Sequence, residues 1–212
     1  MPANRLALRG VLPPLLAILV IGGIAGCGSP RRTAAPQASP SPSVTALHRV
    51  IRGSSVTAIG DSVMLGSSAA LQRRLPGIQI DAQVSRQFTD GLQLIAQLAS
   101  SGQLRRVVVV DLGTNGTVTP AEVRELLAEI GPHRRVVLVN TFEPRRWESE
   151  VNATLAAAAR QRPGVLLANW FALIRHRTGL LSPDHVHPLP AGTILYARLV
   201  RRAVQEAGNL PG

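Results

Sequence analysis

The sequence predicts an α/β domain in which a five-stranded parallel sheet is covered by helices on both faces. From about residue 48 onward, short apolar runs alternate with segments of helical pattern, and several of the runs are continuous in Val, Ile and Leu. Such runs are typical of strands buried on both faces of a parallel sheet. Strands that alternate with helices favour a doubly wound sheet. A hydrophobic content of 45% in 212 residues is sufficient for a packed core.

Each predicted element follows from this alternation. The five apolar runs predict strands at 55–60, 78–84, 107–113, 136–141 and 165–170. The remaining segments predict helices at 68–75, 90–102, 119–131, 147–161 and 191–207. The helix at 119–131 has the clearest start, because Thr119 suits an N-cap, Pro120 suits the first turn and Glu122 completes a capping box. In a doubly wound sheet, ligands bind outside the carboxyl ends of the strands, so the residues after each strand are candidates for a site.

The N-terminus predicts export. Residues 1–9 carry two Arg and no acidic residue, and an uncharged apolar stretch follows them, which is the layout of a secretory signal. A membrane anchor is the alternative, since the stretch lies at the short edge of what can span a bilayer. The segment "IAGC", residues 24–27, resembles the lipobox of bacterial lipoproteins. This resemblance implies that Cys27 is lipidated and holds the protein on the outer face of a bacterial cytoplasmic membrane.

The chain is therefore expected to have three parts. Residues 1–27 are the predicted signal peptide with its lipobox. Residues 28–47 are rich in Pro, Ser and Ala without apolar periodicity, which predicts a disordered tether. Residues 48–212 form the predicted domain, expected to be a monomer.

Composition limits the possible partners. The formal net charge of +11 would attract polyanions such as anionic lipid headgroups or acidic cell-wall polymers. Aromatic residues make up only 3% of the chain, and no basic run is interleaved with them, so nucleic-acid binding is not expected. No group of His, Cys, Asp and Glu has metal-ligand spacing, so neither a metal nor another cofactor is expected.

Polar residues follow the predicted strands. Asp61 and Ser62 follow the first strand, Asn115 stands between two glycines after the third, and Asp184 and His187 lie in "SPDHVHPLPAG" near the C-terminus. Asp61 and Ser62 have a simpler interpretation as helix caps. Capping alone, however, predicts no Asp-x-x-His segment downstream. Ser, His and Asp together are the side chains that nucleophilic acyl transfer requires.

These segments resemble a known family. "GDSV", "GTNG" and "DHVHP" are similar to three of the four sequence blocks of the SGNH (GDSL-like) hydrolases, and the similarity spans roughly residues 55–205. The resemblance implies the SGNH fold, a flavodoxin-like three-layer sandwich, and it implies a role for each matched residue. Ser62 would be the nucleophile, His187 the base and Asp184 its orienting partner. His185 is an adjacent competitor, but only His187 has the family's spacing.

The resemblance also implies an oxyanion hole, with donors from Ser62, Ser85 and Asn115. Most members have Gly in the second block, where this chain has Ser85 in "DAQVSRQ". A backbone N–H donor does not need a glycine, so the hole can survive this difference.

A narrower resemblance points to acyl transfer. "TAIGDSVMLGSSAAL", "DAQVSRQ", "VNTFEPRRWESEVN" and "DHVHPLPAG" are similar to the extracytoplasmic SGNH domains fused to membrane acyltransferases, such as peptidoglycan O-acetyltransferases. In that family the domain moves an acyl group, commonly acetyl, onto a glycan hydroxyl. No integral-membrane half accompanies it here, so a separate membrane protein is expected to supply the acyl donor. Arg86, Arg145 and Trp147 are candidate substrate-binding residues, with plain surface positions as the alternative.

Three function classes remain open. The favoured one is an extracytoplasmic serine esterase or acyltransferase that acts on O-acyl groups of cell-envelope carbohydrate through an acyl-serine intermediate. The second is a carboxylesterase or lipase for small lipophilic esters, for which the chain has few aromatic residues to line a pocket. The third is a non-catalytic envelope-binding module, against which the complete set of polar residues argues.

Overall fold

The computed structural model describes residues 49–210. The predicted signal, the predicted lipidation site Cys27 and the predicted tether lie outside the described residues. Five parallel strands form one sheet in the order β2-β1-β3-β4-β5, which confirms the predicted fold class. The strands are β1 (Val56–Gly60), β2 (Gln79–Ala82), β3 (Val107–Asp111), β4 (Arg135–Val139) and β5 (Val165–Ala168).

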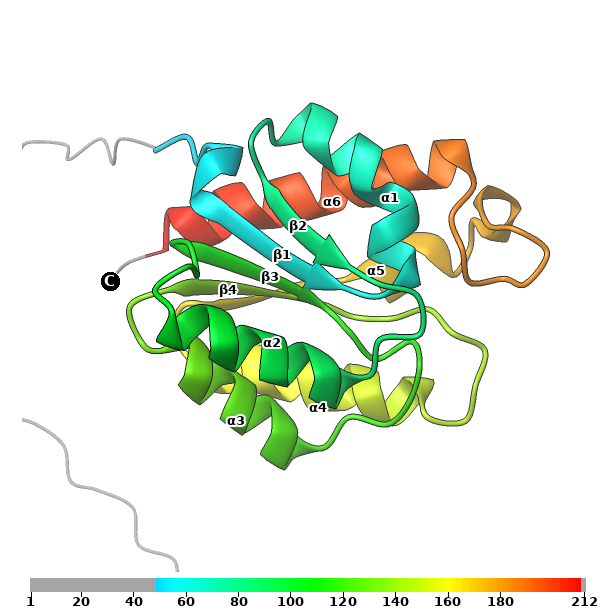
Figure 1. Cartoon of the computed structure of the whole chain (residues 1–212). Helices are drawn as coiled ribbons and strands as arrows, with labels where there is room; N and C mark the ends of the chain where they lie inside the picture. The colour runs from blue at the N-terminus through cyan, green and yellow to red at the C-terminus, as the bar shows by residue number, and fades with distance from the viewer. Residues whose placement is uncertain (1–48, 211–212) are drawn as a thin grey trace, which may run out of the picture. The chain divides into compact units, whose positions relative to one another are not determined.

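Helices cover both faces of the sheet (Figure 1). One layer consists of α1 (Ser62–Arg74), α5 (Trp170–Ile174) and α6 (Pro190–Gly208), and the other of α2 (Phe88–Ser100), α3 (Pro120–Ile130) and α4 (Glu148–Gln161). Two short 3-10 helices, η1 (Gly53–Ser55) and η2 (Thr178–Leu180), complete the elements. None of the helices within residues 49–210 is long and apolar enough to cross a lipid bilayer.

The two faces of the sheet bury separate hydrophobic cores. Val107 and Val109 of β3 point into the core under α1 and α6, whereas Val108 and Val110 point into the core under α2, α3 and α4. This is the two-residue period of a strand that is buried on both sides. Among the described residues, the two cores run from Ile51 to Ala207.

Most boundaries differ from the sequence prediction by one or two residues, and two of the differences have a clear cause. Helix α1 begins at Ser62 rather than at residue 68, because the Asp61 carboxylate caps it by accepting from Val63 N at 2.9 Å. Small residues such as Gly66 weaken the helical pattern of residues 62–67. The last predicted strand ends at Ala168, and Trp170 instead opens α5, where its buried ring meets the Tyr196 ring edge-on at 5.4 Å.

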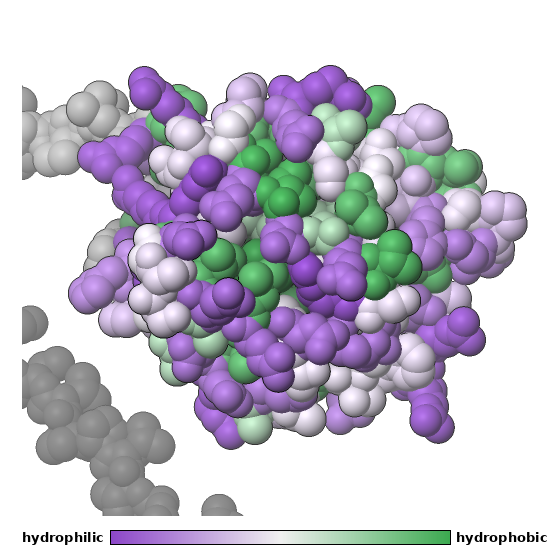
Figure 2. Space-filling view, in the orientation of Figure 1, coloured by the Kyte–Doolittle hydropathy of each residue, from purple (hydrophilic) through white to green (hydrophobic). Residues whose placement is uncertain are grey.

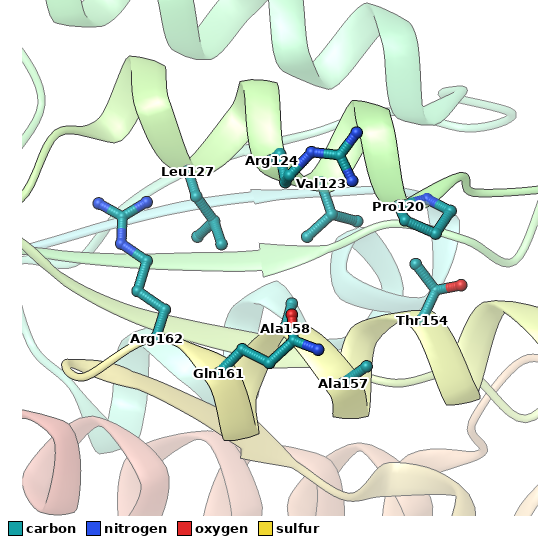
Figure 3. A pocket seen from close by; sticks show the side chains of 9 residues that line it. All are labelled: Pro120, Val123, Arg124, Leu127, Thr154, Ala157, Ala158, Gln161 and Arg162. Carbon is teal, nitrogen blue, oxygen red and sulfur yellow. The ribbon is translucent and has the colours of Figure 1, made fainter.

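A groove of about 380 Å³ lies between α3 and α4 (Figure 3). Val123, Leu127 and Ala158 give it an apolar lining, and Arg124 and Arg162 stand at its edges. None of its lining residues belongs to the polar site at the ends of the strands.

Candidate active site

Three predicted side chains form one hydrogen-bonded chain. Ser62 is the first residue of α1, two positions after the end of β1, whereas Asp184 and His187 lie in the loop between η2 and α6. His187 Nε2 lies 2.8 Å from Ser62 Oγ, and His187 Nδ1 lies 2.7 Å from Asp184 Oδ2. The fold therefore brings together residues that are 125 positions apart in the sequence, with the imidazole between hydroxyl and carboxylate.

The loop that carries the imidazole is held by the same carboxylate. Asp184 Oδ1 accepts hydrogen bonds from Val186 N at 2.9 Å, His187 N at 3.1 Å and Ser182 Oγ at 2.7 Å. Ser182 N also donates to the carbonyl of His187 at 2.8 Å. Ser182 was not among the predicted residues, although a serine two positions before the aspartate is a local hydrogen-bonding signal.

These contacts act on the charge of Asp184. Burial by itself raises the pKa of Asp184, but the hydrogen bonds from Val186 N, the His187 ring, Ser182 and His187 N outweigh it, and the pKa falls below its ordinary value. The side chain is still 49% exposed, so water shares in its solvation. Asp184 is thus held as a carboxylate, the state that orients an imidazole and stabilises its cation.

Ser62 rests on a buried layer of polar side chains. Asp61 and Asp111 are buried at the adjoining ends of β1 and β3, where Asp61 N donates to Asp111 O at 3.2 Å. Tyr196 OH of α6 donates to Asp111 Oδ2 at 2.5 Å. Burial raises the pKa of Asp111 well above its ordinary value, and the nearby Asp61 carboxyl raises it further, while the bond from Tyr196 lowers it only in part. Burial likewise raises the pKa of Asp61.

Of the three predicted oxyanion donors, Ser62 and Asn115 line one crevice, whereas Ser85 is not among its lining residues. As the first residue of α1, Ser62 has a backbone N–H without an intrahelical partner. Ser85 has φ +60°, the left-handed conformation that glycine adopts most easily. This conformation explains why a glycine suits the position, and the serine in this chain takes the same backbone shape. Asn115 Nδ2 donates to the carbonyl of Arg86 at 3.2 Å, which fixes the amide plane.

A crevice of about 330 Å³ opens beside Ser62. Two of the predicted substrate-binding residues, Arg145 and Trp147, line it. Glu143 lines it too and was missed: its carboxylate is buried and accepts from Arg145 Nε at 3.0 Å. The full lining is Ser62, Thr114, Asn115, Glu143, Arg145, Trp147, Asp184, Val186 and His187.

Arg86 does not line the crevice. Its guanidinium is buried and donates to Gly60 O at 3.2 Å, Asp81 O at 2.7 Å and Asp81 Oδ1 at 2.7 Å. These bonds tie the end of β1 to the end of β2. The structure therefore gives Arg86 a positioning role in place of the predicted substrate contact.

Within residues 49–210, no group of three or more His, Cys, Asp or Glu is arranged to hold a metal ion. The five-stranded parallel sheet, the serine at the end of β1 and the Asp-x-x-His loop before the last helix define the class of protein: an SGNH-type hydrolase or acyltransferase.

Comparison with known proteins agrees with this class. No family model matches the chain. It is 35% identical over 143 residues to the peptidoglycan O-acetyltransferase OatA of Listeria monocytogenes, an alignment that covers 68% of this chain and 23% of the relative. It is 31% identical over 156 residues to the O-acetyltransferase OatA of Staphylococcus aureus, covering 73% of this chain and 26% of the relative. The chain thus spans about a quarter of the length of these relatives.

Solved structures give the same result. The C-terminal catalytic domain of peptidoglycan O-acetyltransferase A from Streptococcus pneumoniae, determined with a methylsulfonyl adduct, superposes with a TM-score of 0.67 at 25% identity. The match covers 74% of this chain and 95% of that one. A carbohydrate esterase of family 3 from Talaromyces cellulolyticus has a TM-score of 0.57 at 16% identity and shares the fold. The homologues of this chain are peptidoglycan O-acetyltransferases, and its structural neighbours are the C-terminal SGNH domain of one of them and GDSL-like hydrolases.

Proposed function

We propose that this protein is an extracytoplasmic enzyme that transfers O-acyl groups, above all O-acetyl groups, onto cell-envelope carbohydrate through an acyl intermediate on Ser62. The observation that carries the proposal is the continuous Ser62–His187–Asp184 hydrogen-bond chain at the mouth of a crevice. The names of the homologues, peptidoglycan O-acetyltransferases, support the choice of acyl group and acceptor.

The first half of the reaction would load the serine. Ser62 Oγ attacks the carbonyl carbon of the acyl donor while His187 Nε2 takes the hydroxyl proton, and Asp184 stabilises the imidazolium that forms. The oxyanion of the tetrahedral intermediate would accept from Ser62 N, Ser85 N and Asn115 Nδ2. The intermediate then expels the donor's alcohol, which takes the proton from His187.

The second half of the reaction would transfer the acyl group from Ser62 to the acceptor. A hydroxyl of the acceptor loses its proton to His187 Nε2 and attacks the acyl-serine carbonyl, and the collapse of the second tetrahedral intermediate returns the proton to Ser62 Oγ. Arg145 and Trp147, at the rim of the crevice, would hold the acceptor glycan, with Trp147 offering an apolar ring.

Hydrolysis competes with transfer at this site. The His187 side chain is 47% exposed, so water can also reach the base. The proposed enzyme therefore hydrolyses its acyl-serine slowly when no acceptor is present. An esterase that acts on the same acyl groups, or on small lipophilic esters, is the second candidate on this observation.

The proposed cellular location follows from the N-terminal sequence. A lipid on Cys27 would hold a monomeric domain outside the cytoplasmic membrane, and a separate membrane protein would supply the acyl donor.

The test uses residues 28–212, which keep the whole described domain. The protein is incubated with p-nitrophenyl acetate and peptidoglycan oligosaccharides, and acetylated glycan is sought by mass spectrometry. We expect acetylated glycan that disappears in Ser62→Ala, with unchanged thermal unfolding as the folding control. Acetate release that stays undiminished at high glycan concentration, without acetylated product, would instead identify an esterase.

A further inference from the structure

The two helical layers differ sharply in charge. Helices α1 and α6 contain five Arg and one Glu, a formal net charge of +4. Helices α2, α3 and α4 contain two Arg and six acidic residues, a formal net charge of −4. The sheet separates the two layers (Figure 1). Their helices therefore give the domain a basic side and an acidic side. Such a distribution orients a protein at a charged surface.

The basic side has two hollows lined by arginines. Arg73, Arg74 and Arg198 line one hollow of about 390 Å³ between α1 and α6. Arg52, Arg74 and Arg201 line a second hollow of about 400 Å³ next to it. We call these five arginines the basic face. Within residues 49–210, none of their side chains has an ion-pair or hydrogen-bond partner.

Each hollow also contains an exposed apolar side chain. Ile194, which is 39% exposed, lines the first hollow, and Val50, which is 75% exposed, lines the second. In Figure 2, hydrophilic side chains with isolated hydrophobic ones among them cover the upper edge, where α1 and α6 lie. Arginines beside exposed aliphatic side chains are typical of surfaces that rest in the headgroup region of a bilayer.

We propose that the basic face is a docking surface for a bilayer that contains anionic phospholipid. The guanidinium groups meet the headgroup phosphates, and Val50 and Ile194 enter the apolar boundary beneath them. A soluble phosphate polymer would satisfy the arginines but offers no apolar layer for the two aliphatic side chains. The predicted lipidation site, Cys27, lies only a short tether before Arg52, so the face would remain close to the same membrane.

The test separates this surface from the predicted anchor by using unlipidated residues 28–212. The structural match covers 95% of the solved pneumococcal catalytic domain, which was determined as a separate domain. Residues 28–212 of this chain contain both hydrophobic cores. Binding is measured by flotation with phosphatidylcholine vesicles, with and without phosphatidylglycerol. We expect binding only to the anionic vesicles, and its loss at high salt.

Variants then assign the binding to the face. Arg73→Gln/Arg198→Gln should weaken partitioning into anionic vesicles roughly 30-fold. The matched control Arg124→Gln/Arg160→Gln removes the same charge from the acidic side and should leave binding within about twofold. Val50→Ser/Ile194→Ser should weaken vesicle binding but not binding to a soluble glycerol phosphate polymer. Hydrolysis of p-nitrophenyl acetate by every variant checks that the domain is folded.

Three outcomes would overturn the proposal. The first is absence of binding to anionic vesicles. The second is an equal loss in both arginine double variants, which would indicate net charge rather than a surface. The third is unchanged vesicle binding in the apolar variant together with tight binding of the soluble polymer, which would make the face a polyanion site.

Discussion

Asp184 illustrates how one side chain serves both the loop and the base. Its Oδ1 organises three donors of the loop, and its Oδ2 contacts the imidazole of His187. The position of the base therefore depends on the same group that would stabilise its charge. His185, which lies between Asp184 and His187 in the sequence, has φ +60°, and its backbone N–H donates to the carbonyl of Ser182 at 2.9 Å.

The two histidines of this loop allow a matched comparison. His187→Asn removes the group placed at Ser62 Oγ and should lower kcat for p-nitrophenyl acetate by about three orders of magnitude or more. His185→Asn changes a neighbour in a left-handed conformation that asparagine accepts, and it should leave kcat within about twofold. Equal losses in the two variants would contradict the assignment of the base.

The buried Asp111 predicts a proton-linked change in stability. Its folded pKa is raised above the ordinary value of 3.8, chiefly by burial. The folded state therefore holds a proton that the unfolded state releases, so this contribution to stability is complete below pH 3.8 and is lost as the pH rises through the folded pKa. Asp111→Asn carries no such proton and keeps an acceptor for Tyr196.

The free energy of unfolding, measured by urea denaturation between pH 4 and pH 8, checks this prediction. The fall in stability with rising pH should be shallower in Asp111→Asn than in the parent, by at most about 1.4 kcal/mol per pH unit. Parallel curves for the two proteins would mean that Asp111 is ionised in the folded state.

At the level of elements, the turn from β1 into α1 sets the place of Ser62. A Cβ on Gly60 would lie 2.5 Å from Met64 Cβ, within the first turn of α1. Gly66, in the same helix, has nothing within 4 Å of the Cβ it would carry. The two glycines therefore have opposite roles, one in close packing and one in an exposed helix.

Alanine at each position tests this contrast. Gly60→Ala should destabilise the fold by about 1–3 kcal/mol through overpacking, and should lower kcat because Ser62 moves with the turn. Gly66→Ala should stabilise it by about 0.5–1 kcal/mol, since alanine favours the helix, and leave kcat unchanged. Thermal unfolding and steady-state kinetics measure both. A Gly60→Ala protein as stable and active as the parent would contradict this packing account.

The strands and most helices could be predicted from periodicity, because burial on both faces leaves continuous apolar runs such as Val107–Val110. The start of α1 could not, because a cap and a buried helical face override the weak propensity of its first turn. In the site, residue types and order predicted Ser62 and His187. The direction of the Arg86 side chain and the burial of Glu143 depend on tertiary contacts that no local pattern records.

On the scale of the whole molecule, we expect the full chain to be fixed to the membrane by Cys27, which lies outside the described residues. A fatty-acid probe fed to bacteria that express the chain should label the parent and not Cys27→Ala, because this is the only cysteine. Membranes are washed at high salt, so that electrostatic adsorption through the basic face does not contribute. Labelling that persists in Cys27→Ala would exclude this anchor.

The acyl-serine on Ser62 is the central claim, and peptide mass spectrometry tests it most directly. Residues 28–212 are mixed with p-nitrophenyl acetate, quenched in acid within the first turnover, digested and sequenced. We predict a single acetyl adduct that maps to Ser62, that fails to form in Ser62→Ala and that decays faster when a glycan acceptor is added before the quench. An adduct on another residue, or full turnover in Ser62→Ala, would contradict the account.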